Sequence, residues 1–193
     1  MPKRYIIALI IVAVLFFGGI WLLLSLVTNR GSDEPAAEEP KTTQQTKNFT
    51  QDTNQVIYTT YGPVVAEENR RAIRISISAS ERKVEILNGY FETVASQQSL
   101  SNIEPAFKAL LQALSGAQFE SVDTKNKVDE FSVCSTGQRF VYEAKYSGDQ
   151  SLRSWSNSCL RNQGSFRGNP SLVQTLFETQ IPDYSNFVSN VQL

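Results

Sequence analysis

The chain lacks histidine and contains only two cysteines among its 193 residues. Without histidine, the commonest general base and most nitrogen-ligated zinc sites are excluded. Cys134 and Cys159 alone are too few for a zinc-thiolate site. We therefore predict no metal site, no cofactor and no catalytic residue, and the composition favours a non-catalytic protein over an enzyme.

An excess of charge of either sign is also missing. Lysine and arginine total 18, aspartate and glutamate total 19, and the net charge is -1. A chain without a broad basic field has no electrostatic footprint for nucleic acid. We expect no nucleic-acid partner.

What the chain does contain is an apolar run without a charge from Tyr5 to Val27. As a helix with a rise of about 1.5 Å per residue, this run would reach roughly 34 Å, enough to cross a hydrocarbon core of about 30 Å. A cleaved signal peptide is the alternative, but its apolar region is shorter and ends at a small-residue cleavage site, which Ser25 to Asn29 do not provide. We predict an uncleaved signal-anchor, a single transmembrane helix over residues 5–27 in the lipid bilayer.

The flanking charges and the cysteines predict the orientation of this anchor. Lys3 and Arg4 outweigh Arg30, which favours a cytoplasmic N-terminus over residues 1–4 and an extracytoplasmic C-terminal part at the cell membrane. An oxidising compartment there would allow a disulfide between Cys134 and Cys159, and two reduced buried thiols are the alternative.

The rest of the chain divides by composition into a linker and one domain. Residues 28–54 are rich in Thr, Gln, Asn, Glu and Pro and poor in apolar side chains, which predicts a disordered linker. Residues 55–193 have the usual length of one domain.

Alternating and helical hydrophobic patterns predict the elements of this domain. The period-two pattern and the Asn88-Gly89 hairpin signal favour strands over 56–61, 71–78, 83–87, 90–95, 130–133, 139–146 and 152–157. Helical spacing and caps predict helices over 105–115 and 169–180, with Asn169 as the second N-cap and the apolar C-terminal tail packed onto the core. The fold class is α+β, a mainly antiparallel sheet packed with two helices.

Two carboxylates form the first candidate site. A two-residue turn at Asn88-Gly89 would place Glu85 opposite Glu92, an unfavourable pairing of like charges that a cation or acid-base chemistry would explain. A solvent-screened pair or a different register is the alternative.

Aromatic side chains form the second candidate. A four-residue turn over 147–150 would pair Tyr142 with Trp155 and align them with Phe140 and Tyr146 on one face. Such a stripe suits sugar rings or a peptide, although aromatic side chains at this spacing also form cores.

The loop before the second helix is the third candidate. Gly164 to Asn169 lead into the helix N-terminus, where the free amides beside Arg167 could hold an anion. An ordinary glycine-containing loop is the alternative.

Four short segments carry a resemblance: Tyr61-Gly62-Pro63, Asn88-Gly89-Tyr90, Trp155 to Cys159 and Ile181-Pro182-Asp183-Tyr184. In these the chain resembles uncharacterised single-pass envelope proteins of reduced-genome bacteria, and the resemblance implies no activity. We expect a membrane-anchored extracytoplasmic domain that binds an envelope or surface protein or polymer. The alternatives are a carboxylate-dependent envelope hydrolase and an accessory subunit of a membrane complex.

Overall fold

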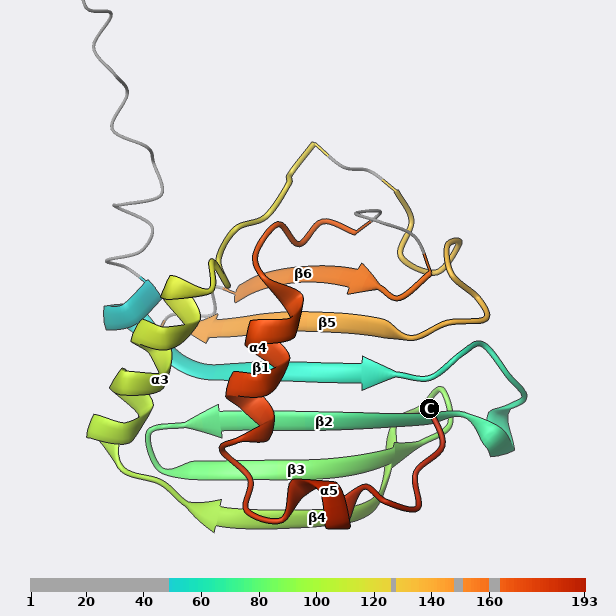
Figure 1. Cartoon of the computed structure of the whole chain (residues 1–193), viewed down its shortest axis with the longest axis horizontal. Helices are drawn as coiled ribbons and strands as arrows, with labels where there is room; N and C mark the ends of the chain where they lie inside the picture. The colour runs from blue at the N-terminus through green and yellow to red at the C-terminus, as the bar shows by residue number, and fades with distance from the viewer. Residues whose placement is uncertain (1–48, 126–127, 148–150, 160–163) are drawn as a thin grey trace, which may run out of the picture. The chain divides into compact units, whose positions relative to one another are not determined.

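Six antiparallel strands form the sheet of this α+β domain, in the order β4-β3-β2-β1-β5-β6 (Figure 1). The computed structural model describes residues 49–125, 128–147, 151–159 and 164–193. The strands are β1 (Thr53–Tyr61), β2 (Arg71–Ser78), β3 (Glu81–Asn88), β4 (Thr93–Ser101), β5 (Arg139–Tyr146) and β6 (Ser151–Asn157). Among the described residues, no helix is both long and apolar enough to cross a bilayer. The expected membrane helix over 5–27 lies outside them.

Helices α3 (Glu104–Gly116), α4 (Pro170–Glu178) and α5 (Tyr184–Phe187) and the 3-10 helix η1 (Glu67–Asn69) accompany the sheet. Helices α3, α4 and α5 lie on one side of the sheet (Figure 1). We call this side the helix face; Tyr58, Ile75 and Tyr142 are among its buried core residues. Apolar residues of the C-terminal tail, including Val188 and Val191, pack against the same core, as expected from the sequence.

The second face of the sheet carries the alternate residues of each strand. A smaller cluster of Tyr61, Ala72, Leu87, Val141 and Trp155 lies on it, with Val133 packed alongside. Charged side chains also lie on this face, as the ion pairs Lys83–Glu85 and Arg153–Glu143 show. Strand β1 is therefore buried on both of its faces.

The alternation of Ile73, Ile75 and Ile77 gives β2 the predicted bounds, and β5 also forms over the predicted residues. Helix α4 begins after Asn169, whose side-chain oxygen accepts a hydrogen bond from the Leu172 amide at 3.1 Å. The predicted N-cap is therefore confirmed.

The predicted linker boundary at residue 54 differs from the structure. Strand β1 already begins at Thr53, and Phe49 is fully buried with its ring centroid 5.7 Å from that of Phe119. The folded part of the chain thus includes residues from Phe49 onward.

The predicted strand over 130–133 is wrong because residues 130–132 form a turn. The Asp129 side chain accepts a hydrogen bond from the Phe131 amide at 3.1 Å, and the Asp129 carbonyl accepts one from the Ser132 hydroxyl at 2.9 Å. This local turn chemistry outweighs the strand preference of Phe131 and Val133.

The predicted disulfide is confirmed: Cys134 is bonded to Cys159, across a sequence separation of 25. The bond joins the loop before β5 to the residues that follow β6. A Cβ at Gly137 would approach both sulfur atoms within 2.6 Å, so the turn packs directly on the disulfide.

The outer edge of β6 is covered by residues 164–166. The Phe166 amide donates to the Trp155 carbonyl at 3.0 Å, and the Trp155 amide donates to the Ser165 hydroxyl at 3.2 Å. A Cβ at Gly164 would lie 1.9 Å from the Trp155 carbonyl oxygen, so only glycine permits this approach.

We predict that Gly164→Ala lowers the free energy of unfolding by about 1 to 3 kcal/mol, because the added methyl group collides with backbone rather than with a movable side chain. Gly116→Ala is the control. Its Cβ meets nothing within 4 Å, and alanine at the end of α3 should be neutral or stabilising by up to about 1 kcal/mol. Urea unfolding measures the stability of both variants, and equal stabilities would contradict the close approach of Gly164 to the Trp155 carbonyl.

Candidate binding site

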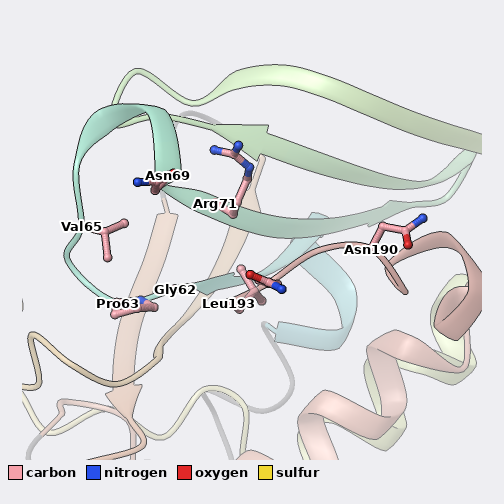
Figure 2. Close-up of a pocket in the computed structure, with 8 residues that line it drawn as sticks. Gly62, Pro63, Val65, Asn69, Arg71, Asn190 and Leu193 are labelled. Carbon is pink, nitrogen blue, oxygen red and sulfur yellow. The ribbon is translucent and has the colours of Figure 1, made fainter.

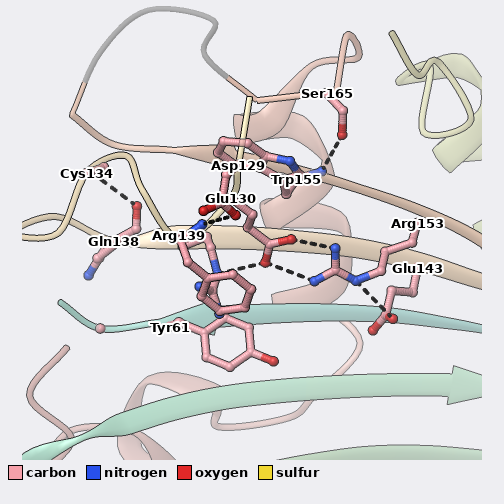
Figure 3. Close-up of polar contacts among 12 residues, drawn as sticks. Tyr61, Asp129, Glu130, Cys134, Gln138, Arg139, Glu143, Arg153, Trp155 and Ser165 are labelled. Atoms are coloured by element: carbon pink, nitrogen blue, oxygen red, sulfur yellow. Dashed lines mark hydrogen bonds and ion pairs between the residues drawn. The ribbon is translucent and has the colours of Figure 1, made fainter. Parts of the chain in front are cut away.

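Polar and aromatic side chains converge on the second face, where β1 ends and β2 and β5 begin. Tyr61 is the last residue of β1 and is paired with Ala72 on one side and Arg139 on the other. Directly paired residues project from the same face, so the Arg139 side chain lies beside the Tyr61 ring. Figure 3 shows Tyr61 and Arg139 together with Glu130 and Arg153.

Two guanidinium groups lie over aromatic rings here. The Arg139 guanidinium is 4.3 Å from the centroid of Tyr61 and 4.6 Å from that of Phe131. The Arg70 guanidinium is 5.4 Å from the centroid of Tyr61 and 4.7 Å from that of Tyr90. Each guanidinium thus lies against two aromatic rings, and the negative face of a ring attracts a cation.

Glu130 joins two of the arginines from the loop before β5. Its carboxylate accepts hydrogen bonds of 2.5 and 2.9 Å from the two terminal nitrogens of Arg153 (Figure 3). Its Oε1 atom also forms an ion pair with Arg139 Nε at 3.0 Å. A nearly buried carboxylate thereby holds both side chains in fixed positions.

Glu92 forms the second carboxylate contact, from the turn between β3 and β4. It accepts a hydrogen bond from the Tyr61 hydroxyl at 2.7 Å and forms an ion pair with Arg74. Burial alone would raise the pKa of Glu92, but the bonds from Tyr61 and Arg74 outweigh it and the pKa is lowered. Burial and the Glu92 carboxylate raise the pKa of Tyr61 to about 12, so the hydroxyl remains the donor.

Arg70 differs from these arginines because no carboxylate pairs with it among the described residues. It is only 4 % exposed. Its Nη1 atom donates to the carbonyls of Gly62 and Pro63 at 3.1 and 3.0 Å. Burial, with the nearby charges of Arg70 and Arg153, lowers the pKa of Arg139 although Glu130 and Tyr61 oppose the shift.

These side chains line a cavity of about 190 Å³ that we call the arginine pocket. Arg70, Arg139 and Arg153 are its cationic side chains, and Tyr61, Tyr90 and Phe131 are its aromatic ones. Such a mixture of aromatic and guanidinium groups suits an anionic group with apolar surroundings.

A larger cavity of about 420 Å³ lies between residues 62–71 and the last residues of the chain (Figure 2). Arg71 is the charged side chain among its lining residues, and its Nη1 atom donates to the carbonyls of Glu68 and Arg70. Because this cavity brings no group of reactive or charged side chains together, the arginine pocket is the better candidate. Within the described ranges, no group of three or more cysteine, aspartate or glutamate side chains could hold a metal ion.

The predicted pairing of Tyr142 with Trp155 is wrong by one residue. Tyr142 is paired with Ser154, and Trp155 is paired with Val141. Tyr142 is fully buried in the core of the helix face, with its ring centroid 4.0 Å from that of Phe166, whereas Trp155 lies on the second face. Strands β5 and β6 are thus paired in a different register from the one assumed, and the two rings do not form one stripe. The expected turn over 147–150 lies largely outside the described residues.

The predicted facing of Glu85 and Glu92 is also wrong. Glu85 is paired with Gln97, while Glu92 lies in a four-residue connection between Asn88 and Thr93 and has a positive φ of 54°. Glu85 forms an ion pair with Lys83 at 3.0 Å. Each carboxylate therefore has its own cation, and the two do not form a shared site.

The third predicted site residue, Arg167, stabilises its own loop. Its guanidinium donates to the carbonyls of Gly164 and Phe166 and to the Asp123 carboxylate at 2.8 Å. The Asn169 side chain caps the helix that follows. These contacts engage the Arg167 guanidinium and the Leu172 amide, which were among the groups expected to hold an anion.

Sequence reasoning missed most of the arginine pocket. Glu130, Tyr90 and Phe131 have no sequence pattern that indicates a shared site with Arg70. These four residues come from three connections that are far apart in the sequence and meet only through the strand order. An arginine just before a strand, at Arg70, is the one hint that the sequence contains.

Neither a family model nor a curated protein matches this chain. The fold and the site therefore define only a class: an α+β domain with an antiparallel sheet, a disulfide and a pocket of arginine and aromatic side chains.

We predict that Glu92→Gln destabilises the protein at neutral pH and removes part of its acid sensitivity. Because folding lowers the pKa of Glu92, its stabilisation is complete above the unfolded value near 4.5 and is lost as the pH falls through the folded pKa. The stability difference between wild type and Glu92→Gln should therefore shrink below pH 4.5.

Urea midpoints between pH 7 and pH 3 test this prediction. Glu68→Gln is the control, since Glu68 is exposed and its carboxylate forms no ion pair with the described residues. A difference for Glu92→Gln that stays constant across this pH range would contradict the role of its charge.

Proposed function

We propose that this chain is a membrane-anchored binding protein whose extracytoplasmic domain contacts a protein partner through the arginine pocket and its rim. The supporting observation is a set of exposed apolar side chains beside the guanidinium groups of the arginine pocket, of which Arg70 is buried. Phe91 is 90 % exposed, Phe131 is 68 % exposed, and Tyr90 is about half exposed. Single exposed apolar side chains are common on protein surfaces, but apolar side chains gathered in one patch with a polar rim mark an interaction site.

The composition of this surface favours a protein over a polysaccharide or a lipid. Tyrosine and arginine are enriched among the residues that dominate protein interfaces, where aromatic anchors lie next to fixed polar groups. The contacts of Glu130 and Glu92 already hold Arg139 and Arg74 in place. Less side-chain entropy would be lost on binding.

The position of the domain rests on residues 5–27. Their length and lack of charge support a single-pass anchor, and the disulfide between Cys134 and Cys159 agrees with an oxidising compartment. A partner in the cell envelope or at the cell surface follows from this placement.

The geometry does not favour the hydrolase alternative. Its proposed carboxylates, Glu85 and Glu92, are ion-paired with Lys83 and Arg74. The lowered pKa of Glu92 is opposite to the raised value that a general acid at neutral pH requires. A role as an accessory subunit of a membrane complex is compatible with the proposal, because such a subunit would contact its partners through the transmembrane anchor.

We predict that the full chain remains in the membrane pellet after alkaline carbonate extraction, whereas a chain lacking residues 1–27 appears in the supernatant. The apolar run should partition into the hydrocarbon core, because the transfer of apolar side chains from water to hydrocarbon lowers their free energy. Protease added outside intact cells should digest the C-terminal domain. Release of the full chain by carbonate would contradict the anchor.

We predict that a photo-crosslinking amino acid at Phe91 or Phe131 gives the same adduct in native membranes. Ile103 is the matched control, because it is 64 % exposed and apolar but lies before α3, away from the arginine pocket. The partner recovered in this way should bind Phe91→Ser and Phe131→Ser variants at least tenfold more weakly, and Ile103→Ser as tightly as wild type. Equal adducts from residue 103, or unchanged binding by both phenylalanine variants, would refute the proposed surface.

A further inference from the structure

The starting observation is the buried charge of Arg70. Removing a guanidinium from water is costly unless hydrogen bonds or an opposite charge replace its hydration. Arg70 uses Nη1 for two carbonyls, and its Nε and Nη2 atoms have no hydrogen-bond partner within the described part of the chain. The side chain also lines the arginine pocket.

Arg139 presents further donors to the same cavity. Its Nε atom faces Glu130, while its two terminal nitrogens form no hydrogen bond with the described residues. In contrast, both terminal nitrogens of Arg153 donate hydrogen bonds to Glu130, and its Nε atom lies 3.7 Å from a carboxylate oxygen of Glu143. The unused donors of the pocket therefore belong to Arg70 and Arg139.

Among the described residues, the ion pairs around the cavity leave one cation, Arg70, without a carboxylate. Glu92 is paired with Arg74, Glu130 with Arg139 and Arg153, and Glu143 also with Arg153, so three carboxylates accompany four arginines. Glu67 accepts a hydrogen bond from the Tyr90 amide and forms no ion pair with the described residues, Arg70 included. A single negative charge would balance Arg70, whereas a dianion would bring a second negative charge, which no further unpaired arginine balances, into a cavity that the Glu92 carboxylate also lines.

The size of the cavity limits what can enter it. About 190 Å³ is below the 300 to 1,000 Å³ typical of sites for whole small molecules. It is sufficient for one planar anionic group with a short apolar stem. A guanidinium offers parallel N–H donors that match the two oxygens of a carboxylate.

We propose that the arginine pocket binds a carboxylate group, an acidic side chain or a C-terminal carboxylate, presented by the protein partner. Arg70 and Arg139 donate hydrogen bonds to its two oxygens, and Tyr90 and Phe131 contact the apolar atoms next to it. This assignment rests on the proposed function for the identity of the partner. The pocket itself can be tested without the partner.

The test is an NMR titration of the full chain in detergent micelles, with ¹⁵N-labelled arginine and benzoate as the probe. Benzoate should shift the Nε signals of Arg70 and Arg139 saturably. Benzamide, which has the same ring without the charge, should not shift them, and phenyl phosphate should bind more weakly. Sodium chloride at the same ionic strength is the control for an adventitious ion only.

Variants locate the interaction. Arg70→Gln should weaken benzoate binding at least tenfold, and Arg71→Gln, which changes the neighbouring residue outside the pocket, should leave it unchanged. Arg139→Gln is the second variant and should also weaken binding. If Arg70→Gln fails to fold, the wild-type titration and Arg139→Gln still decide the question.

Several results would overturn the proposal: no saturable shift with benzoate, equal shifts with benzamide or chloride, or tighter binding of phenyl phosphate. Unchanged benzoate affinity in folded Arg70→Gln and Arg139→Gln would also overturn it. If benzoate fails while the crosslinks at Phe91 and Phe131 persist, the binding surface remains and only the carboxylate assignment is wrong.

Discussion

The pairing of β1 with both β2 and β5 is the constraint on which the rest of the structure depends. It joins the first half of the domain to the second, because β2, β3 and β4 attach on one side of β1 and β5 and β6 on the other. The same register fixes the two faces of the sheet. Tyr58 is placed beside Ile75 and Tyr142 in the core, and Tyr61 is placed beside Arg139 at the candidate site. A shift by one residue would exchange these environments.

Much of the fold could be predicted because its signals are local. Three isoleucines at alternate positions indicate β2, and Asn169-Pro170 mark the start of α4. The errors occurred where short-range and long-range effects compete. The Asp129 side chain accepts a hydrogen bond that stabilises a turn where a strand was predicted. Four residues connect Asn88 to Thr93 where a two-residue turn was expected.

The candidate site could not be predicted for a different reason. Arg70, Tyr90 and Phe131 are each unremarkable in their own segments, and their chemistry arises only when three connections meet at one end of the sheet. The predicted residues Tyr142 and Arg167 are instead used by the fold, one in the core and one in a loop. An aromatic or basic residue in the sequence does not reveal which of these roles it will have.

The disulfide links the environment of the domain to the geometry of the arginine pocket. Cys134 follows Glu130 and Phe131 by only a few residues, and its bond to Cys159 ties this loop to the end of β6. In the chain-entropy model, the bond lowers the entropy of the unfolded chain and so stabilises the folded state by about 3 kcal/mol for a loop of this length. Reduction would release the loop that carries Glu130.

The two edges of the sheet differ in a way that bears on assembly. Ser165 and Phe166 bond to the Trp155 amide and carbonyl at the β6 edge, whereas β4 has only β3 as a strand neighbour and its residues are largely exposed. From Thr93 to Ser101 this strand contains no charge and no proline, the features that usually discourage edge pairing. A strand that paired with this sheet would find free length along β4, whereas at the other edge it would meet residues 164–166 beside Trp155.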